Sequence, residues 1–243
     1  MDAVELYYSR DPIVEAILGI AIEPIPNERV SDLQQLQTAA GQEYTNQQLV
    51  QKLAGQFDLA TGSTTSTRTP VGYSFQTPDS RETFTARTDM FLYHRLKPYP
   101  GWQEFRDEAA RLWNVYRTAV HEPRITQCEL RYINRLELPA GQELNLYLQT
   151  FPEVGKSLPQ MLLGYVLEAV LKLDSMLGGQ VILRQRMVPS DIPDHVSIIL
   201  DNSVIFHADA DEQTLWGMFD TARVEKNRIF QGCITSAMED RIK

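Results

Sequence analysis

ELRYINRLELP, residues 129–139, contains the clearest secondary-structure pattern in this chain. From the preceding cysteine onward, the residues with even numbers are Cys128, Leu130, Tyr132, Asn134, Leu136 and Leu138. Those at odd positions are Glu129, Arg131, Ile133, Arg135 and Glu137. Because successive side chains of a strand point to opposite faces, this pattern predicts a strand whose even side chains enter the core.

The odd face of this strand has two interpretations, and the sequence leaves both open. Its alternating acids and arginines are typical of a solvated sheet face, on which neighbouring charges pair. Alternatively, Arg131 and Arg135 lie about 13 Å apart at strand rise and form a rigid recognition surface for an anion or a partner. Arg184 and Arg186 of a second predicted strand, QVILRQRM, would then complete that surface.

Asn134 is the one polar residue on the predicted core face. A buried amide needs hydrogen-bond partners, so we expect Asn134 to be buried and bonded to backbone. Its predicted role is to fix a bulge or a loop end, and contact with a ligand is the alternative.

The N-terminal half continues with alternating and helical patterns. In residues 14–22, as in residues 129–139, apolar side chains recur at every second position, which predicts a half-buried strand. Residues 28–53 are rich in Gln and Leu and predict two short helices broken near residues 41–46. The small polar segment at 61–70 predicts a loop or a mobile edge strand, and a strand meander follows it.

Helical periodicity marks the end of each half. Residues 101–120 carry an apolar stripe that includes Trp102, Phe105 and Trp113, which predicts a long helix. In the second half, further strands lead to a helix predicted from about 214 to 242, with Asp211 as its cap.

We therefore predict an α+β fold of antiparallel β-sheets packed against long helices. The order of elements suggests two similar β-α-β-β-β-α halves, residues 1–122 and 123–243, which form one compact unit. Since the residues themselves show no internal repeat, the duplication is a hypothesis about architecture alone.

Composition excludes several classes of protein. A net charge of −9 argues against non-specific binding to nucleic acid, which requires an excess of Lys and Arg. Two cysteines without CxxC spacing indicate neither a disulfide framework nor a zinc site and favour a cytoplasmic location. The apolar run near the N-terminus is short and interrupted by Glu15 and Glu23, so we expect neither secretion nor a membrane span.

No linear motif for catalysis or cofactor binding is present. The sequence has no GxSxG, SxxK, HExxH, Walker or GxGxxG pattern, so we predict no catalytic residue, no metal site and no cofactor. His207, Asp209 and Asp211 resemble metal ligands in type, but their place between a strand and a helix favours helix capping.

Several segments resemble a bacterial family of sporadically distributed proteins of about 250 residues and unknown function. The segments are DPIVEAILGI, YSFQTPD, YPGWQEFRDEAARLW and, most specifically, LRYINRLELP. The resemblance spans essentially the whole chain. It implies a stand-alone cytoplasmic protein encoded on mobile or defence-related islands, and it carries over no catalytic residue.

Together these observations predict a non-enzymatic binding or regulatory protein that acts through protein contacts. The resemblance places it in a bacterial defence or toxin-antitoxin-like system, with a protein partner encoded by a neighbouring gene, and self-association is a further option. One alternative is a small-ligand or nucleotide sensor that uses the arginine-bearing face. Another is an enzyme, such as a nuclease, whose site is not linear in sequence.

Overall fold

The computed structural model describes residues 8–57, 59, 61–208 and 212–243. The cap expected at Asp211 lies outside them, as does Asp209 of the same motif. The helices are α1 (Val30–Gln34), α2 (Leu36–Ala40), α3 (Trp102–Val120), α4 (Glu212–Cys233) and α5 (Ser236–Ile242), with short 3-10 turns at Asn27–Arg29 and Leu144–Leu146. The strands are β1 (Ile13–Ile22), β2 (Asn46–Phe57), β3 (Thr64–Gln76), β4 (Glu82–Arg87), β5 (Met90–Leu96), β6 (Ile125–Pro139), β7 (Val166–Lys172), β8 (Gln180–Pro189) and β9 (His195–Phe206).

Strand pairing corrects the predicted fold class. The nine strands pair in the order β2-β3-β4-β5-β1-β6-β9-β8-β7, which is a single antiparallel sheet. Strands make up 41% of the structure and helices 27%. The prediction of several sheets packed against long helices is therefore wrong. Periodicity within segments could not reveal that strands from both halves hydrogen-bond into one sheet, because pairing partners far apart in sequence leave no local signal.

The chain divides into two compact units that interleave in sequence. Unit 1 comprises Met1–Ile17, Leu96–Pro100 and Gln127–Lys243, and unit 2 comprises Leu18–Arg95 and Gly101–Thr126. Strand β1 therefore contributes residues to both units.

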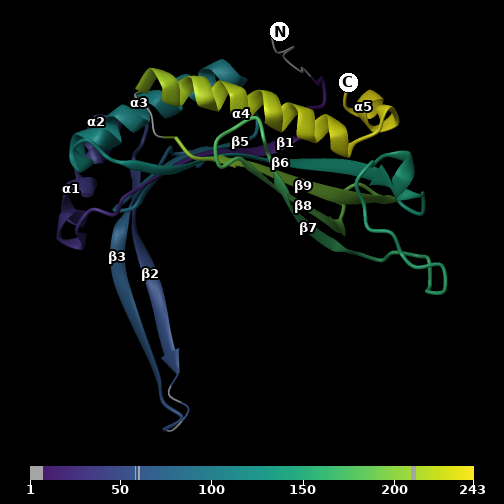
Figure 1. Cartoon of the computed structure of the whole chain (residues 1–243), viewed down its shortest axis with the longest axis horizontal. Helices are drawn as coiled ribbons and strands as arrows, with labels where there is room; N and C mark the ends of the chain where they lie inside the picture. The colour runs from purple at the N-terminus through teal and green to yellow at the C-terminus, as the bar shows by residue number, and fades with distance from the viewer. Residues whose placement is uncertain (1–7, 58, 60, 209–211) are drawn as a thin grey trace. The chain divides into compact units, whose positions relative to one another are not determined.

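In unit 2, helix α3 packs on strands through aromatic side chains. The predicted helical stripe is confirmed, since Trp102, Phe105 and Trp113 are buried. Ring contacts join Phe84 to Phe91 at 5.6 Å and Phe91 to Trp113 at 5.6 Å, which fixes the helix over β4 and β5. The paired strands β2 and β3 extend away from the rest of this unit (Figure 1).

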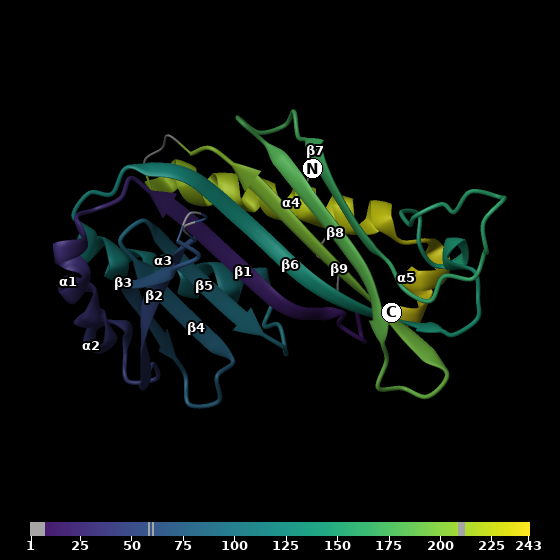
Figure 2. The same ribbon diagram turned by 90° about the horizontal axis from the view of Figure 1, so that it is seen from below.

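In unit 1, helices α4 and α5 pack on one face of the strands β6, β9 and β8. The core beneath them contains Leu136, Leu200, Phe230, Cys233 and Met238, all buried. Figure 2 shows the other face of these strands, with α4 behind them. The even parity predicted for the core side of β6 is confirmed, because its side chains alternate between buried and half-buried from Cys128 to Pro139.

The predicted helix after residue 46 is wrong. Residues 46–57 form strand β2, which pairs along its whole length with β3. The Gln- and Leu-rich composition favours a helix intrinsically, but pairing with β3 satisfies the backbone instead. Residues 64–70, expected to be a loop or an edge strand, belong to β3.

Candidate functional site

All four arginines singled out by sequence lie on one face of unit 1. Arg135 and Arg186 both stand opposite Ile199 of β9, and Arg184 stands opposite Asp201. Residues directly opposite each other in a sheet share a face. We call this surface the open face: the odd-numbered side chains of β6 and β9 with the even-numbered side chains of β8 and β7. The structure thus brings the arginines together, although β9 separates β6 from β8.

Arg131 is held tightly by an acid on the neighbouring strand. Its Nε donates to Oδ1 of Asp201 at 2.8 Å and its Nη2 to Oδ2 at 2.7 Å. Asp201 is only 8% exposed. The hydrogen bonds to Asp201 raise the pKa of Arg131 above its ordinary value. This guanidinium is therefore half of a partly buried bidentate pair.

Arg135 belongs to a second cluster on the same face. Its Nε donates to Oε1 of Glu137 at 2.8 Å and to Oγ of Ser197 at 3.1 Å. Burial alone would raise the pKa of Glu137, but hydrogen bonds from Ser190, Arg135 and Ser197 outweigh it and hold the pKa below its ordinary value. Glu137 is thus a stabilised carboxylate that neutralises Arg135.

The other two arginines differ from each other. Arg184 donates to Oε2 of Glu168 at 2.6 Å, and both side chains are substantially exposed. Arg186 is exposed and makes no ion pair within the described ranges. Since Arg131, Arg135 and Arg184 already face carboxylates, their positive charge is compensated locally, which weakens the case for an anion site here.

Asn134 lies on the opposite, helix-covered face and is 3% exposed. Its Nδ2 donates to the carbonyl oxygen of Leu200 at 3.2 Å. The prediction that it is buried and bonded to backbone is confirmed. Because it points away from the four arginines, it cannot share a ligand with them on the open face.

Replacing Asn134 with Leu is expected to lower the free energy of unfolding by about 1 to 2 kcal/mol, since it removes a bond to a buried carbonyl. Chemical denaturation would measure the change. Gln127→Met, a substitution near the start of β6 where residues are exposed, serves as the control and should change stability by less than about 0.5 kcal/mol. Equal stability of the two variants would contradict the assigned role.

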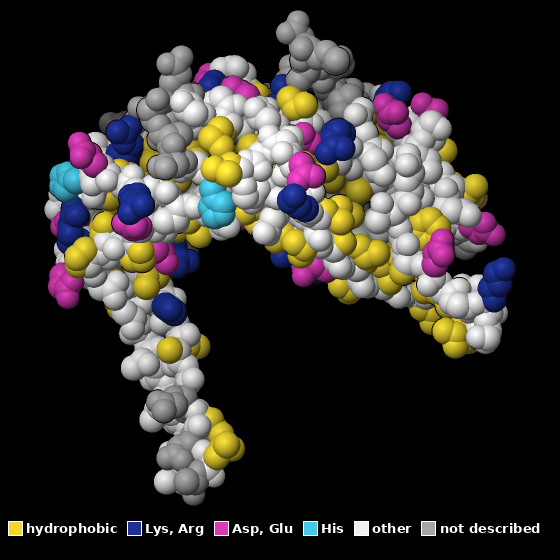
Figure 3. All heavy atoms as spheres, in the orientation of Figure 1, with side chains coloured by type: hydrophobic (Ala, Val, Ile, Leu, Met, Phe, Trp, Pro, Cys, Tyr) yellow, Lys and Arg dark blue, Asp and Glu magenta, His cyan; other side chains and the backbone are white. Residues whose placement is uncertain are grey.

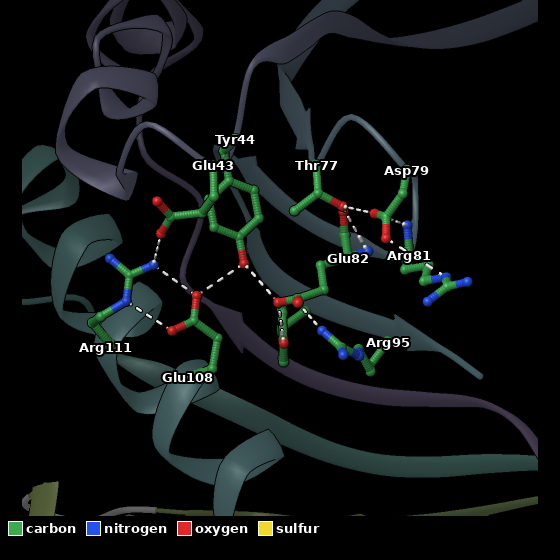
Figure 4. Close-up of polar contacts among 10 residues, drawn as sticks. Glu43, Tyr44, Thr77, Asp79, Arg81, Glu82, Arg95, Glu108 and Arg111 are labelled. Carbon is green, nitrogen blue, oxygen red and sulfur yellow. Dashed lines mark hydrogen bonds and ion pairs between the residues drawn. The ribbon is translucent and has the colours of Figure 1, made fainter. Parts of the chain in front are cut away.

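Unit 2 contains a polar network that sequence reasoning missed (Figure 4). The hydroxyl of Tyr44 lies 2.9 Å from Oε1 of Glu108 and 3.2 Å from Oε2 of Glu82. Tyr93 donates to the same Glu82 oxygen at 2.8 Å. Arg95 pairs with Glu82, and Arg111 pairs with Glu108 at 2.6 Å and with Glu43 at 3.2 Å.

The chemistry of this network is structural. Tyr44 has one hydroxyl hydrogen, so it donates to Glu108, the nearer acceptor, while Tyr93 supplies Glu82. Burial, with the charge of Glu108 adding to it, raises the pKa of both phenols well above the ordinary value. The phenols therefore remain protonated donors. Each carboxylate also has an arginine partner, and the network ties α3 to β4 and β5.

Helix α4 carries a buried lysine, which faces strand β6 of unit 1. Lys226 is 8% exposed, and its Nζ sits 3.7 Å from the centre of the Tyr132 ring. The Tyr132 hydroxyl is 2.7 Å from that of Tyr99. Burial, with the nearby charge of Arg223, lowers the pKa of Lys226 to about 7, and Asp11 opposes this shift. This is a strained placement for an ammonium group, because cation–π contact compensates only part of its lost hydration.

The two cysteines are unpaired, as predicted. Cys128 and Cys233 are both free and buried. Burial raises the pKa of both thiols, so neither is an activated nucleophile in the folded protein.

The most exposed large apolar side chains described in unit 2 are Leu53 and Phe57 on strand β2 and Leu59, 90% exposed, in the turn that follows it. We call residues 51–57 with 64–70 the arm. Every arm residue whose side chain is described is exposed, on both faces of the hairpin. Leu53 is 66% exposed and Phe57 is 60% exposed. Figure 3 shows the arm as a thin projection with isolated hydrophobic side chains.

Register places the two large apolar side chains of strand β2 in the arm on the same face. Leu53 and Phe57 have the same parity after the irregularity at Val50/Gln51, and they stand opposite Arg68 and Thr64. The other face carries Lys52 and Ala54 of β2. Its β3 members are Thr65, Thr67 and Thr69. The face with Leu53 and Phe57 therefore carries two large apolar side chains among polar ones, which include Ser66 and Arg68, and the other face carries no large apolar side chain.

Comparisons with known proteins add no relative. No protein-family model matches the chain, and no curated protein matches it in sequence. The resemblance noted from the sequence is untested by these results and stays a hypothesis. Among the described residues, no helix combines the length and apolar character that crossing a bilayer requires.

Proposed function

We propose that this protein works by binding another protein, and that the arm is its contact element. The observation that carries the proposal is the pair Leu53 and Phe57, two large apolar side chains that lie on the same face of the arm and are 66% and 60% exposed. Phe and Leu side chains gain on the order of 1.5 to 3 kcal/mol each when fully buried. A partner that covers this face therefore gains affinity from residues that contribute nothing to the core of the free protein.

The stability of the arm supports the same proposal. Over residues 51–57 and 64–70 the hairpin consists of two strands only, for a length of about 20 Å. An isolated two-stranded hairpin is marginally stable in water because it has no third strand or helix to cover a face. A long arm of this kind is retained at a thermodynamic cost, which a binding role explains.

The partner is proposed to be a protein with an apolar groove or cleft that accepts Leu53 and Phe57. The threonine-rich opposite face suits solvent, so the arm inserts with one face buried and one wet. A cytoplasmic setting is proposed from the two unpaired cysteines together with the family resemblance. A partner encoded by a neighbouring gene, in a defence or toxin-antitoxin-like system, is proposed from the resemblance alone.

A pair of matched variants tests the arm. The double substitution Leu53→Ser and Phe57→Ser removes both large apolar side chains from their face, and the double substitution Thr65→Ser and Thr67→Ser alters the opposite face. Tagged proteins are captured from the native host, and the stoichiometric partner is quantified and then titrated in purified form. We expect the first variant to weaken binding by at least about tenfold and the second by less than about twofold.

Thermal melting provides the control for folding. Both variants should melt within about 2 °C of the parent, because the arm lies outside either core. Equal partner recovery by the parent and the Leu53/Phe57 variant would refute the proposal.

A further inference from the structure

Strand β7 ends the sheet in unit 1 and is unusually apolar for an edge. Within the part of the chain that the structure describes, β7 pairs with β8 and with no other strand. Val166 is 83% exposed, Val170 is 59% exposed and Leu171 is 49% exposed. An exposed apolar edge presents unpaired N–H and C=O groups and is a template for pairing with another strand.

The open face shows which kind of strand fits beside β7. One row across the sheet runs Asp201, Arg184, Glu168, with alternating charge. This row ends at the edge with an acid, so a base is the favoured next residue. The adjacent row runs Ser203, Ile182, Val170 and ends with an apolar side chain.

The sequence of β7 itself supplies both of these neighbours. We infer that β7 pairs antiparallel with β7 of a second copy of this chain, about a two-fold axis at Val170. In this register Glu168 of each copy faces Lys172 of the other, and Val170 faces Val170. On the opposite face of the sheet, Ala169 stands against Leu171. Every position of the edge from 168 to 172 thus meets a complementary one.

Neighbouring registers lack this fit. A two-fold axis at Ala169 would set Glu168 against Val170 and Lys172 against Val166, and an axis at Leu171 would set Lys172 against Val170. Each of these places charges opposite apolar side chains and leaves no pair of opposite charges facing each other. Since register is specified by the pattern of side chains on each face, the axis at Val170 is favoured.

The present contacts of the two charged residues are compatible with the dimer. Lys172 pairs with Asp174 at 2.6 Å, but both side chains are at least 80% exposed, so the pair contributes little and can be exchanged. Glu168 retains Arg184 and gains the lysine of the other copy. The inference concerns a surface in unit 1 and does not depend on the arm.

Charge exchange tests the register. Glu168→Lys and Lys172→Glu each place like charges opposite each other twice in the dimer, and each should weaken self-association by at least about tenfold. The double variant, with both substitutions in one chain, should recover association to within about threefold of the parent. An equimolar mixture of the two single variants should form a heterodimer. Sedimentation velocity at about 100 µM chain measures all four cases.

A cysteine placed on the axis tests the geometry directly. Val170→Cys should form an intermolecular disulfide under mild oxidation, because the two positions face each other within bonding range. Val166→Cys is the control and should not, since it faces residue 174 in this register. The native cysteines are buried and do not compete.

Each result of these experiments either supports or contradicts the β7 dimer. Dimerisation of the parent with restoration in the double variant supports the inference. A parent that is monomeric at this concentration, single variants that associate like the parent, or crosslinking by Val166→Cys rather than Val170→Cys would each overturn it. Melting temperatures within a few degrees of the parent establish that the variants are folded.

Discussion

Replacing Arg131 with Gln is expected to lower the free energy of unfolding by about 2 to 3 kcal/mol. Its bidentate partner Asp201 is 8% exposed, so removal of the guanidinium leaves a carboxylate with little access to water. An exposed ion pair would contribute less than about 1 kcal/mol. Urea denaturation of the purified variant measures the difference.

Arg184→Gln is the matched control for this experiment, because it breaks a pair on the same face whose side chains are 38% and 55% exposed. It should change stability by less than about 1 kcal/mol. Adding Asp201→Asn to Arg131→Gln should recover part of the loss, since no charge is then stranded. If the Arg131 and Arg184 variants are equally stable, the open face is solvated throughout and the Arg131 pair has no special weight.

Replacing Lys226 with Met is expected to raise the free energy of unfolding by about 2 to 4 kcal/mol near neutral pH. The lysine is almost fully buried, and its pKa of about 7 in the folded protein lies far below the ordinary value of 10.5. Methionine matches its length without carrying a charge into the core. Lys156→Met, at an exposed position, is the control and should have no measurable effect.

The pH dependence of the Lys226 effect follows from the direction of the shift. Below about pH 7 the lysine is charged in the folded and unfolded states, so the full cost of burying the ammonium is present. As pH rises from about 7 towards 10.5, the folded protein releases the proton while the unfolded chain keeps it, and the parent gains stability. The advantage of Lys226→Met should therefore shrink steadily over this range. An advantage that is constant with pH would contradict the buried, charged lysine.

Sequence reasoning succeeded where a pattern is local. The two-residue alternation of 128–138 identified the core face of β6, including buried Asn134, and the spacing of Trp102, Phe105 and Trp113 identified α3. These patterns depend only on how one element meets the core, so they survive without knowledge of its neighbours.

Sequence patterns did not predict the features of the fold that depend on pairing between strands. Residues 46–57 became a strand because β3 pairs with them, and the single sheet arises from pairing between distant strands. The arrangement of the candidate site also depends on strand pairing. That four arginines share a face follows from the register with β9, which the sequence alone does not give.

The polar network around Tyr44 and the buried Lys226 differ in how far the sequence predicts them. The network of Tyr44, Glu82 and Glu108 draws on the loop after α2, on β4 and on α3, with no spacing that links them. The burial of Lys226, in contrast, can be predicted from the sequence, because this residue falls in the helical stripe that runs through Phe219 and Cys233. A lysine at a core position of an amphipathic helix indicates a buried charge.

The most direct test of arm-mediated binding is amide hydrogen exchange on the chain alone and in complex with its captured partner. In the free protein, amides of residues 51–57 and 64–70 should exchange faster than those of β4 and β5, because the arm has no third strand or helix over it. In the complex, exchange in the arm is expected to slow by at least about tenfold. Protection confined to the open face of unit 1, with the arm unchanged, would contradict it.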